Sequence, residues 1–275
     1  MTAMGMLGSV SYMSVSRSKP LSMLSSVKPL GSIFHPAMFL SLLGQFTVHL
    51  LVMMTAVWRA KSYQDEDHKV DLDGLFKPGI LNSVVFLVNN VQSVTVFVVN
   101  LQGRPFMTGL TENRPLLWSL VATFILTFMF ASESIPSLNK YFQLVPFPDD
   151  EFRDFLLRLL LLDVTATFAF DRLMKFIFSP DILFASVKGT TMKDVFGLMK
   201  TCLMILMVMY VFLGNEETWD QLLEEQEAWE AAESAAEAGE IGIDVGVVAD
   251  VVGNVAVMMN SSVVEGGMDH MMGEL

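Results

Sequence analysis

The chain has only one cysteine, Cys202, and few charged residues. A single thiol excludes an internal disulfide framework and any Cys-based metal site. Charged residues make up 17% of the chain and hydrophobic residues 52%, and the mean hydropathy is +0.49. This composition is too apolar for an ordinary soluble domain. The sequence therefore predicts a membrane protein.

Basic residues are absent from the last part of the chain. Residues 1–200 hold all 17 Lys and Arg residues beside 15 Asp and Glu, whereas residues 216–275 hold 15 acidic residues and no basic one. The chain has no basic patch of the kind that binds nucleic acid, so we expect no nucleic-acid partner. Residues 214–275 are predicted to form an acidic, low-complexity and partly disordered tail, with an acidic helix over 216–240.

Catalytic motifs are also missing. The sequence contains no P-loop, no GxGxxG, no HExxH and no GxSxG. Its four histidines are scattered without the spacing of metal ligands. We therefore predict no catalytic, cofactor-binding or metal-ligating residue in this chain.

Long uncharged runs are what the chain does have. Residues 80–101 form a run of 22 uncharged residues, and residues 115–132 form one of 18. Each helix of that length spans the hydrocarbon core of a bilayer, which is about 30 Å thick. The sequence predicts an all-α, polytopic membrane helix bundle over 16–178, with four crossings at about 36–58, 80–101, 115–132 and 154–172.

Two further apolar stretches flank this bundle. Residues 1–15 resemble the end of a membrane helix whose beginning lies outside the chain. Residues 195–213 are long enough to cross the membrane but include Lys200, so this segment either spans or lies in the interface as an amphipathic helix.

The distribution of basic residues predicts the orientation of the bundle. The loops at 16–31, 102–115 and 171–193 carry nine Lys and Arg residues, and the alternate loops at 59–79 and 133–153 carry six. Because cytoplasmic loops are enriched in basic residues, the first set is expected on the cytoplasmic side.

A polar stripe runs along the first predicted crossing. Ser41, Gln45 and His49 recur every four residues, which places them on one face of a helix. Such groups act as hydrogen-bonding links between membrane helices or line a polar cavity. We favour the first interpretation, in which each group contributes about 0.6 kcal/mol.

The second crossing is unusually rich in carboxamides. Asn89 and Gln92 lie among Asn82, Asn90, Ser93 and Asn100 in an otherwise apolar segment. These side chains are expected to face protein or a wet cavity instead of acyl chains. Packing against neighbouring helices is the preferred interpretation, and a transport or substrate groove is the alternative.

The fourth crossing contains an ionisable residue, Asp163, with Arg158 five residues before it. A carboxylate at the centre of a membrane helix costs about 2.5–3.5 kcal/mol on insertion scales, which makes Asp163 a functional candidate. The alternative is a structural group whose partner lies on a helix outside this chain. The spacing places Arg158 on another face, so we expect no ion pair between the two.

Several short motifs, taken together, resemble the C-terminal end of type V P-type ATPases of subgroup A. In order along the chain they are Ser16–Leu21, Gly44–Phe46, Val48–His49, Asn82–Val84, Gly103, Pro105–Met107, Glu112–Asn113, Pro115–Leu116, Trp118–Leu120, Leu161–Asp163 and Asp171–Arg172. The resemblance covers about residues 1–178, and nothing after Phe178 has a counterpart in the pattern.

The resemblance implies a location in the endoplasmic reticulum membrane and a role beside an ATP-driven transmembrane-helix dislocase, a family formerly described as cation pumps. It identifies the crossings as helices that support the transport helices. The family's phosphorylated aspartate in DKTGT, its actuator loop and its nucleotide domain do not occur here. ATP and Mg²⁺ are therefore expected only for a full-length member, and the partners are the bilayer and the remaining domains.

Two alternatives remain open at the level of sequence. Besides the supporting role that the resemblance implies, the chain could be a stand-alone, non-catalytic membrane protein whose acidic tail binds a partner. It could also be a small independent transporter that uses the amide-rich helix and Asp163. The interior polar candidates in each case are Gln45, His49, Asn89, Gln92 and Asp163.

Overall fold

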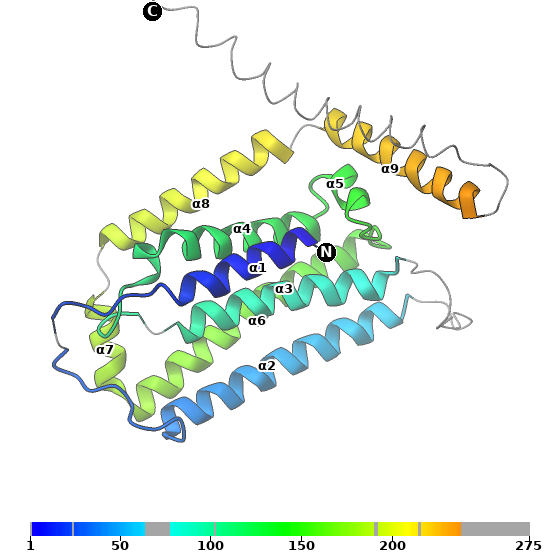
Figure 1. Ribbon diagram of the computed structural model, residues 1–275. Coiled ribbons are helices and arrows are strands. Elements are labelled where there is room, and N and C mark those ends of the chain that lie inside the picture. The colour runs from blue at the N-terminus through cyan, green and yellow to red at the C-terminus, as the bar shows by residue number, and fades with distance from the viewer. Residues whose placement is uncertain are drawn as a thin grey trace, which may run out of the picture. The chain divides into compact units, whose positions relative to one another are not determined.

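The computed structural model describes residues 2–23, 25–63, 78–101, 103–189, 192–213 and 216–237. These residues are predominantly helical and include no strand, which confirms the predicted all-α fold (Figure 1). The helices, in chain order, are α1 (Thr2–Val15), α2 (Pro36–Lys61), α3 (Ile80–Asn100), the short 3₁₀ turn η1 (Leu110–Glu112), α4 (Arg114–Ala131), α5 (Pro136–Tyr141), α6 (Asp150–Phe178), α7 (Pro180–Gly189), α8 (Met192–Leu213) and α9 (Glu216–Glu237).

The chain divides into two compact units, and the boundary along the sequence falls within α9, between residues 220 and 221. The first unit contains the helix bundle, and the second is described only as far as residue 237. The acidic helix expected over 216–240 is present as α9. The remainder of the predicted acidic tail, residues 238–275, lies outside the described residues.

Three helices of the described chain are long and apolar enough to cross a membrane: α2, α3 and α4. They coincide with three of the four predicted crossings. The fourth, α6, is continuous over 29 residues and extends beyond the predicted 154–172 at both ends. It is not among the three, because it carries Arg158, Asp163 and Asp171 along its length. Its crossing stays a prediction.

Residues that favour the start of a helix lie at the first turns of α2 and α6. Pro36 occupies the first turn of α2, where its missing N–H leaves no bond unmade, and His35 Nδ1 accepts a hydrogen bond from Ala37 N at 3.2 Å. At the start of α6, the Asp149 carboxylate accepts from Phe152 N at 2.6 Å. A capping carboxylate at this position also interacts favourably with the positive end of the helix dipole.

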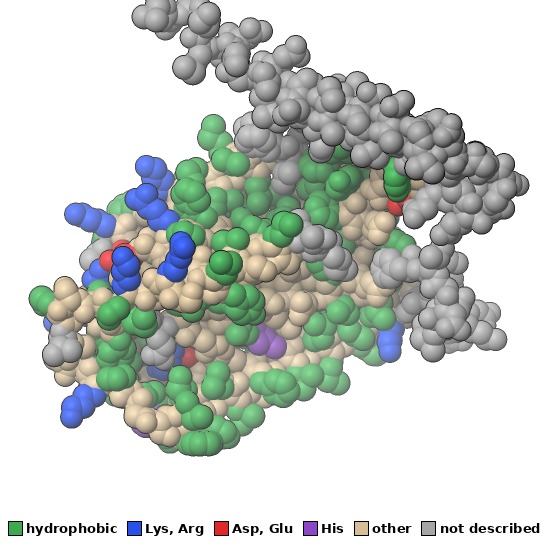
Figure 2. Space-filling model, in the orientation of Figure 1, with side chains coloured by type: hydrophobic (Ala, Val, Ile, Leu, Met, Phe, Trp, Pro, Cys, Tyr) green, Lys and Arg blue, Asp and Glu red, His purple; other side chains and the backbone are tan. Residues whose placement is uncertain are grey.

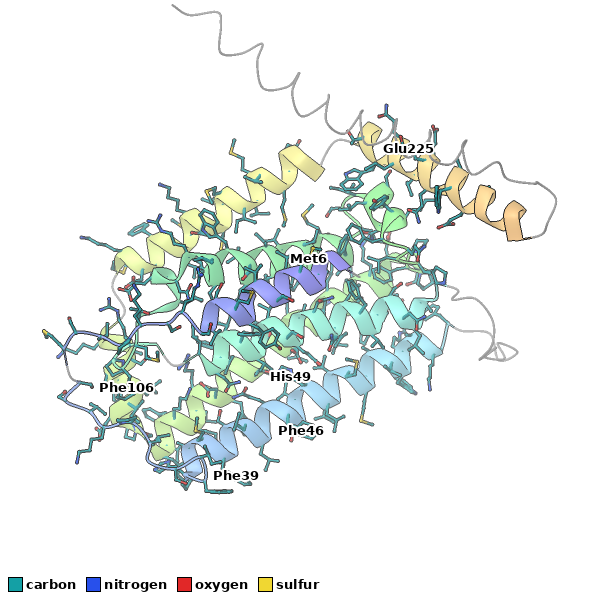
Figure 3. The ribbon with its side chains drawn as sticks, viewed as in Figure 1. Met6, Phe39, Phe46, His49, Phe106 and Glu225 are labelled. Atoms are coloured by element: carbon teal, nitrogen blue, oxygen red, sulfur yellow. The ribbon has the colours of Figure 1, made fainter. Side chains whose placement is uncertain are left out.

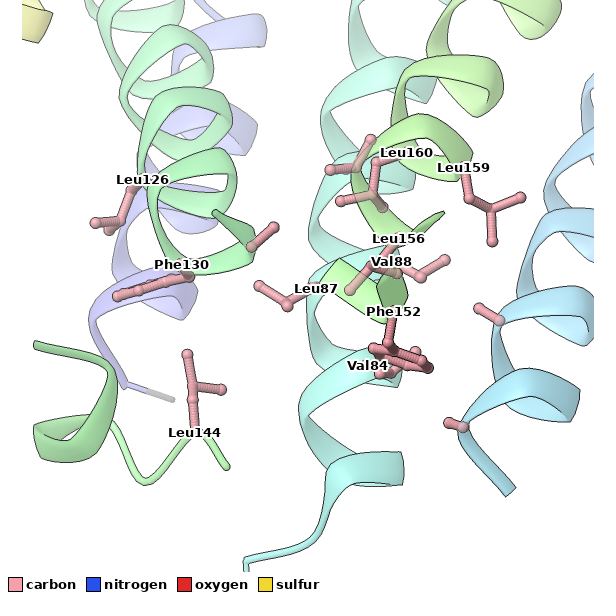
Figure 4. Close-up of a cluster of buried hydrophobic side chains, with 14 of the residues drawn as sticks. Val84, Leu87, Val88, Leu126, Phe130, Leu144, Phe152, Leu156, Leu159 and Leu160 are labelled. Atoms are coloured by element: carbon pink, nitrogen blue, oxygen red, sulfur yellow. The ribbon is translucent and has the colours of Figure 1, made fainter. Parts of the chain in front are cut away.

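The apolar core lies between α3, α4 and α6 (Figure 4). Leu87, Phe130, Phe152, Leu156 and Leu160 are each at most 1% exposed. In lipid, packing such side chains gains dispersion energy but little hydrophobic energy, since acyl chains are equally apolar. Small and polar residues therefore have a larger part in deciding which helices associate.

Three loops meet at one end of the bundle. Thr108 N donates to Lys19 O at 3.0 Å, and Thr111 Oγ1 donates to an Asp194 carboxylate oxygen at 2.9 Å. These contacts join residues 16–35, residues 103–113 and the start of α8, and we call this region the basic end. On the visible face, Lys and Arg side chains gather here (Figure 2).

The other two loops meet at the opposite end. Tyr63 OH donates to Asp149 Oδ2 at 3.1 Å, and Arg59 Nη2 lies 3.4 Å from Glu151 Oε1. Val145 N donates to Ser83 Oγ at 3.0 Å, which ties the start of α3 to the segment before α6. The alternation of loops expected from the basic-residue count is therefore present in the fold.

Two short helices, α5 and α7, were not predicted, and the α8 segment was left open between crossing and interfacial positions. In the structure, α8 packs against α4 and runs lengthwise beside it (Figure 1). Most of its apolar side chains are exposed, Phe196, Leu203 and Met207 among them. Helix α8 is not among the three helices of the described chain that are long and apolar enough to cross a membrane, so both interpretations of this segment stay predictions.

Candidate functional site

The polar stripe of α2 faces α3 and α6. Ser41 and Gln45 are buried, and the side chain of His49 is 12% exposed. The four-residue spacing keeps the three side chains on the same side of the helix, where α6 packs against α2. Figure 3 shows His49 on the side of α2 that faces α3.

Asp163 is paired with His49. The two Asp163 carboxylate oxygens lie 2.9 and 3.0 Å from His49 Nδ1, and Asp163 is 1% exposed. A carboxylate can only accept when it is ionised, so His49 Nδ1 then carries the donated hydrogen. Asp163 thus has a partner within this chain, His49 on α2. Arg158 Nε instead donates to the backbone oxygen of Asp154 at 3.1 Å.

Gln92 joins the pair from α3. Its Nε2 donates to His49 O at 2.9 Å and lies 3.5 Å from Asp163 Oδ1. Three helices, α2, α3 and α6, thus contribute to one polar contact in the interior. The other imidazole nitrogen, His49 Nε2, is buried and has no hydrogen-bond partner among the described residues.

A second polar cluster lies toward the basic end. Asp171, also 1% exposed, accepts from Ser41 Oγ at 2.7 Å and from Lys175 Nζ at 2.9 Å. Gln45 Nε2 donates to Ser41 Oγ at 2.9 Å, and Asn100 Nδ2 donates to Gln45 Oε1 at 2.8 Å. The same three helices therefore meet in both clusters.

Sequence reasoning missed Asp171, Lys175 and Asn100 as members of the site. One signal was available for Asp171, which lies eight residues after Asp163. That separation places both carboxylates on one face of α6, matching the face of α2 that carries Ser41 and His49.

Close approach of α2 and α6 depends on Gly44. A side chain at this position would overlap the Phe170 ring, which lies against the Gly44 backbone. Small residues at helix interfaces allow backbones to approach in membranes, where packing and hydrogen bonds hold helices together. Gly44 therefore brings the polar faces of the two helices within hydrogen-bonding reach.

A groove of about 680 Å³ runs beside the His49 cluster. Its walls include Tyr12 from α1, His49 from α2, and Asn89, Gln92 and Asn100 from α3. Asn89 is exposed, and its side chain makes no hydrogen bond to the rest of the described chain. His49, Gln92 and Asp163 are thus brought together, and Gln45 belongs to the second cluster. Asn89 lines the groove without joining either cluster.

The described residues contain no group of three or more His, Cys, Asp or Glu side chains that could hold a metal ion. The donors and acceptors of the two clusters are mostly engaged with one another. The arrangement can hold three helices in register, and it presents amide groups to the groove.

Comparison with known proteins relates the chain to a membrane translocase family. A protein of Aspergillus fumigatus named endoplasmic reticulum transmembrane helix translocase is 36% identical over 178 residues, which is 65% of this chain and 14% of that protein. The translocase of the same name from Saccharomyces cerevisiae is 34% identical over 180 residues, 66% of this chain and 15% of its own length. A probable manganese-transporting ATPase of Arabidopsis thaliana is 33% identical over 177 residues, 64% of this chain and 15% of its own length.

The chain spans about one seventh of the length of these relatives. No protein-family model matches the chain.

Proposed function

We propose that this chain forms a helix bundle that supports an ATP-driven translocase of transmembrane helices. Over about two thirds of its length, the chain belongs to the type V P-type ATPases of the endoplasmic reticulum. The bundle lies in the membrane of the endoplasmic reticulum. Its partners are the lipid bilayer and the energy-coupling domains of the translocase.

The observation that carries this proposal is the double link between α2 and α6. Asp163 is bound by His49, and Asp171 is bound by Ser41 and Lys175. Buried carboxylates whose partners belong to the same bundle hold helices in fixed register, because separating the helices would leave a charge in lipid. A fixed scaffold suits a supporting role beside moving transport helices.

Energy coupling belongs to other parts of the translocase. The 275 residues contain no DKTGT motif and no nucleotide-binding motif. In this proposal the chain binds no cofactor itself, and ATP and Mg²⁺ act on the domains that it supports.

A chimera tests the proposal. Residues 1–178 would replace the homologous segment of the Saccharomyces cerevisiae translocase, and the purified chimera would be reconstituted in proteoliposomes with a single-span substrate. We expect ATP-dependent extraction of the substrate by the chimera and no ATP hydrolysis by the 275-residue chain alone. A folded chimera without extraction activity contradicts the supporting role, and ATP hydrolysis by the isolated chain contradicts the non-catalytic role.

One observation favours a second candidate, a small independent transporter. His49 lines the groove and pairs with Asp163, and Asn89 presents an unpaired amide to the same space. Ion flux into proteoliposomes that contain only this chain, abolished by Asp163→Asn, would support it. Absence of flux with the unaltered chain removes this candidate.

A further inference from the structure

A second, smaller cavity of about 260 Å³ lies at the basic end of the bundle. Its walls come from the end of α3, the loop before α4, the end of α6, and helices α7 and α8. Two of its lining residues, Arg104 and Arg172, are cationic and one, Asp194, is anionic. We call it the basic-end cavity.

The Arg172 guanidinium has N–H donors that make no hydrogen bond within the described chain. Its guanidinium lies 4.6 Å from the centre of the Phe168 ring, and its nearest carboxylate oxygen, Asp171 Oδ2, is 3.7 Å away. Asp171 already accepts hydrogen bonds from Ser41 and Lys175. The Arg172 guanidinium, which carries five N–H donors, thus makes a 3.7 Å ion pair with Asp171 but no hydrogen bond to a described residue.

Arg104, the second cationic residue of the lining, is held in place by an ion pair. Its guanidinium pairs with Glu112 Oε1, and the second oxygen of Glu112 accepts from Gly109 N at 2.7 Å. One Arg104 nitrogen thus fixes the group, and the others stay available. The single acid of the lining, Asp194, is engaged by Thr111 Oγ1.

Apolar side chains complete the cavity. Its lining includes Val98 of α3, Leu101 directly after α3, and Val195 and Leu198 of α8. Helix α3 is a candidate membrane span, so the cavity lies where a membrane helix reaches the bilayer surface. A free anion would use only the arginines, whereas a phospholipid would use both the arginines and the apolar walls.

We propose that the basic-end cavity binds the phosphate of an anionic phospholipid, with the acyl chains lying along the exposed apolar face of α8. Arginine suits this ligand because its planar fork donates two parallel hydrogen bonds to phosphate oxygens. Basic pockets between membrane helices at the cytoplasmic face bind lipid head groups in the same way. The predicted orientation places the basic end on that face.

Binding of dioctanoyl phosphatidylinositol to the full chain, purified in detergent, tests the proposal by native mass spectrometry or thermophoresis. We expect saturable binding that is stronger than that of dioctanoyl phosphatidylcholine. Arg172→Gln should weaken binding of phosphatidylinositol by about fivefold to tenfold, the effect of one cation near an anionic lipid. Arg172→Lys should weaken it less, because the charge remains while the fork is lost.

The matched control is Arg153→Gln, which removes the same charge from the other end of α6. Arg153 pairs with Asp150 at 2.9 Å and is remote from the cavity lining. Equal weakening by Arg153→Gln would mean attraction by net charge alone and would overturn the proposal. Absence of saturable binding, or equal affinity for phosphatidylcholine, would also overturn it.

A second variant and thermal melts distinguish loss of the binding site from misfolding. Leu198→Trp keeps every charge and fills the cavity, so it too should weaken binding of phosphatidylinositol. Thermal melts of each variant establish that it is folded, and unaltered binding by folded Leu198→Trp contradicts the proposal. Competition by inorganic phosphate at the same concentration as the lipid would assign the cavity to a free anion instead.

Discussion

Replacing His49 with leucine should destabilise the bundle more than any loss of a single hydrogen bond. The substitution removes the Nδ1 donor that lies 2.9 Å from Asp163, and Gln92 at 3.5 Å is too distant to replace it. The Asp163 carboxylate, 1% exposed, would then be left without a close donor. A lone acidic group at the centre of a membrane helix costs about 2.5–3.5 kcal/mol, whereas an interhelical hydrogen bond contributes about 0.6 kcal/mol on average. The first effect dominates, so we expect His49→Leu to cost about 3 kcal/mol.

The double variant separates these two effects. Asp163→Leu alone leaves a buried imidazole without its acceptor and should cost about 1–3 kcal/mol. In His49→Leu/Asp163→Leu neither partner remains, so its cost should be smaller than that of His49→Leu alone. The free energy of unfolding would be measured by circular dichroism in mixed micelles with increasing sodium dodecyl sulfate. Additive costs in the double variant would refute the reasoning.

Two exposed threonines on the same helices supply the control cycle. Thr47 of α2 and Thr165 of α6 each donate only to the backbone of their own helix. Thr47→Leu and Thr165→Leu should therefore have additive effects, each within about 0.5 kcal/mol.

Three further predictions concern packing, titration and capping. Gly44→Leu should separate α2 from α6, because the added side chain overlaps Phe170, and should cost about 1–3 kcal/mol in the same unfolding assay. The hydrogen bond from Gly109 N–H, and next that from the Arg104 guanidinium, lower the pKa of Glu112 from its ordinary 4.5. The stabilisation of this loop should therefore be present at neutral pH and lost as the pH falls below 4.5 toward the lowered value. Amide exchange at Gly109 measures this loss. Asp149→Ala removes the cap of α6 and should cost about 1 kcal/mol, measured by the same unfolding transition.

Each of these predictions has a contrasting variant. Gly197→Ala in α8 meets no atom within 4 Å and should be neutral or slightly stabilising, so a loss equal to that of Gly44→Leu would contradict the packing argument. Glu112→Gln should abolish the acid-dependent exchange, and its persistence would assign the effect to another group. Asp149→Asn should retain most of the stability, since asparagine also caps helices, and equal loss in both variants would point to the Tyr63 contact instead.

The positions of the membrane helices were readable from the sequence because long uncharged runs are strong signals. The run at 36–58 became α2, and the run at 115–132 became α4 with a shift of one residue. Helix α6 exceeds its predicted 154–172 because its first and last turns are charged, so an apolar run underestimates its length. The short helix α5 has no such run and was missed.

The candidate site was readable only in part. Periodicity gave the polar face of α2, and the charge inside an apolar run singled out Asp163, but neither signal shows which helix lies opposite. The contact between His49 and Asp163 joins residues 114 apart in the sequence, and it depends on the helix pairing that Gly44 allows. Asn89 was predicted with the others, yet it faces the groove, since a stripe of amides does not reveal which of them finds a partner.

The two carboxylates of α6 also bear on how the protein enters the membrane during synthesis. Asp163 and Asp171 are each bound to α2, which is made more than a hundred residues earlier. Alone in lipid, α6 would carry an insertion penalty of about 2.5–3.5 kcal/mol for Asp163, the charge near its centre. If α6 crosses the membrane, we therefore expect α2 to stay near the insertion site until α6 is made, so that the two helices enter the bilayer together.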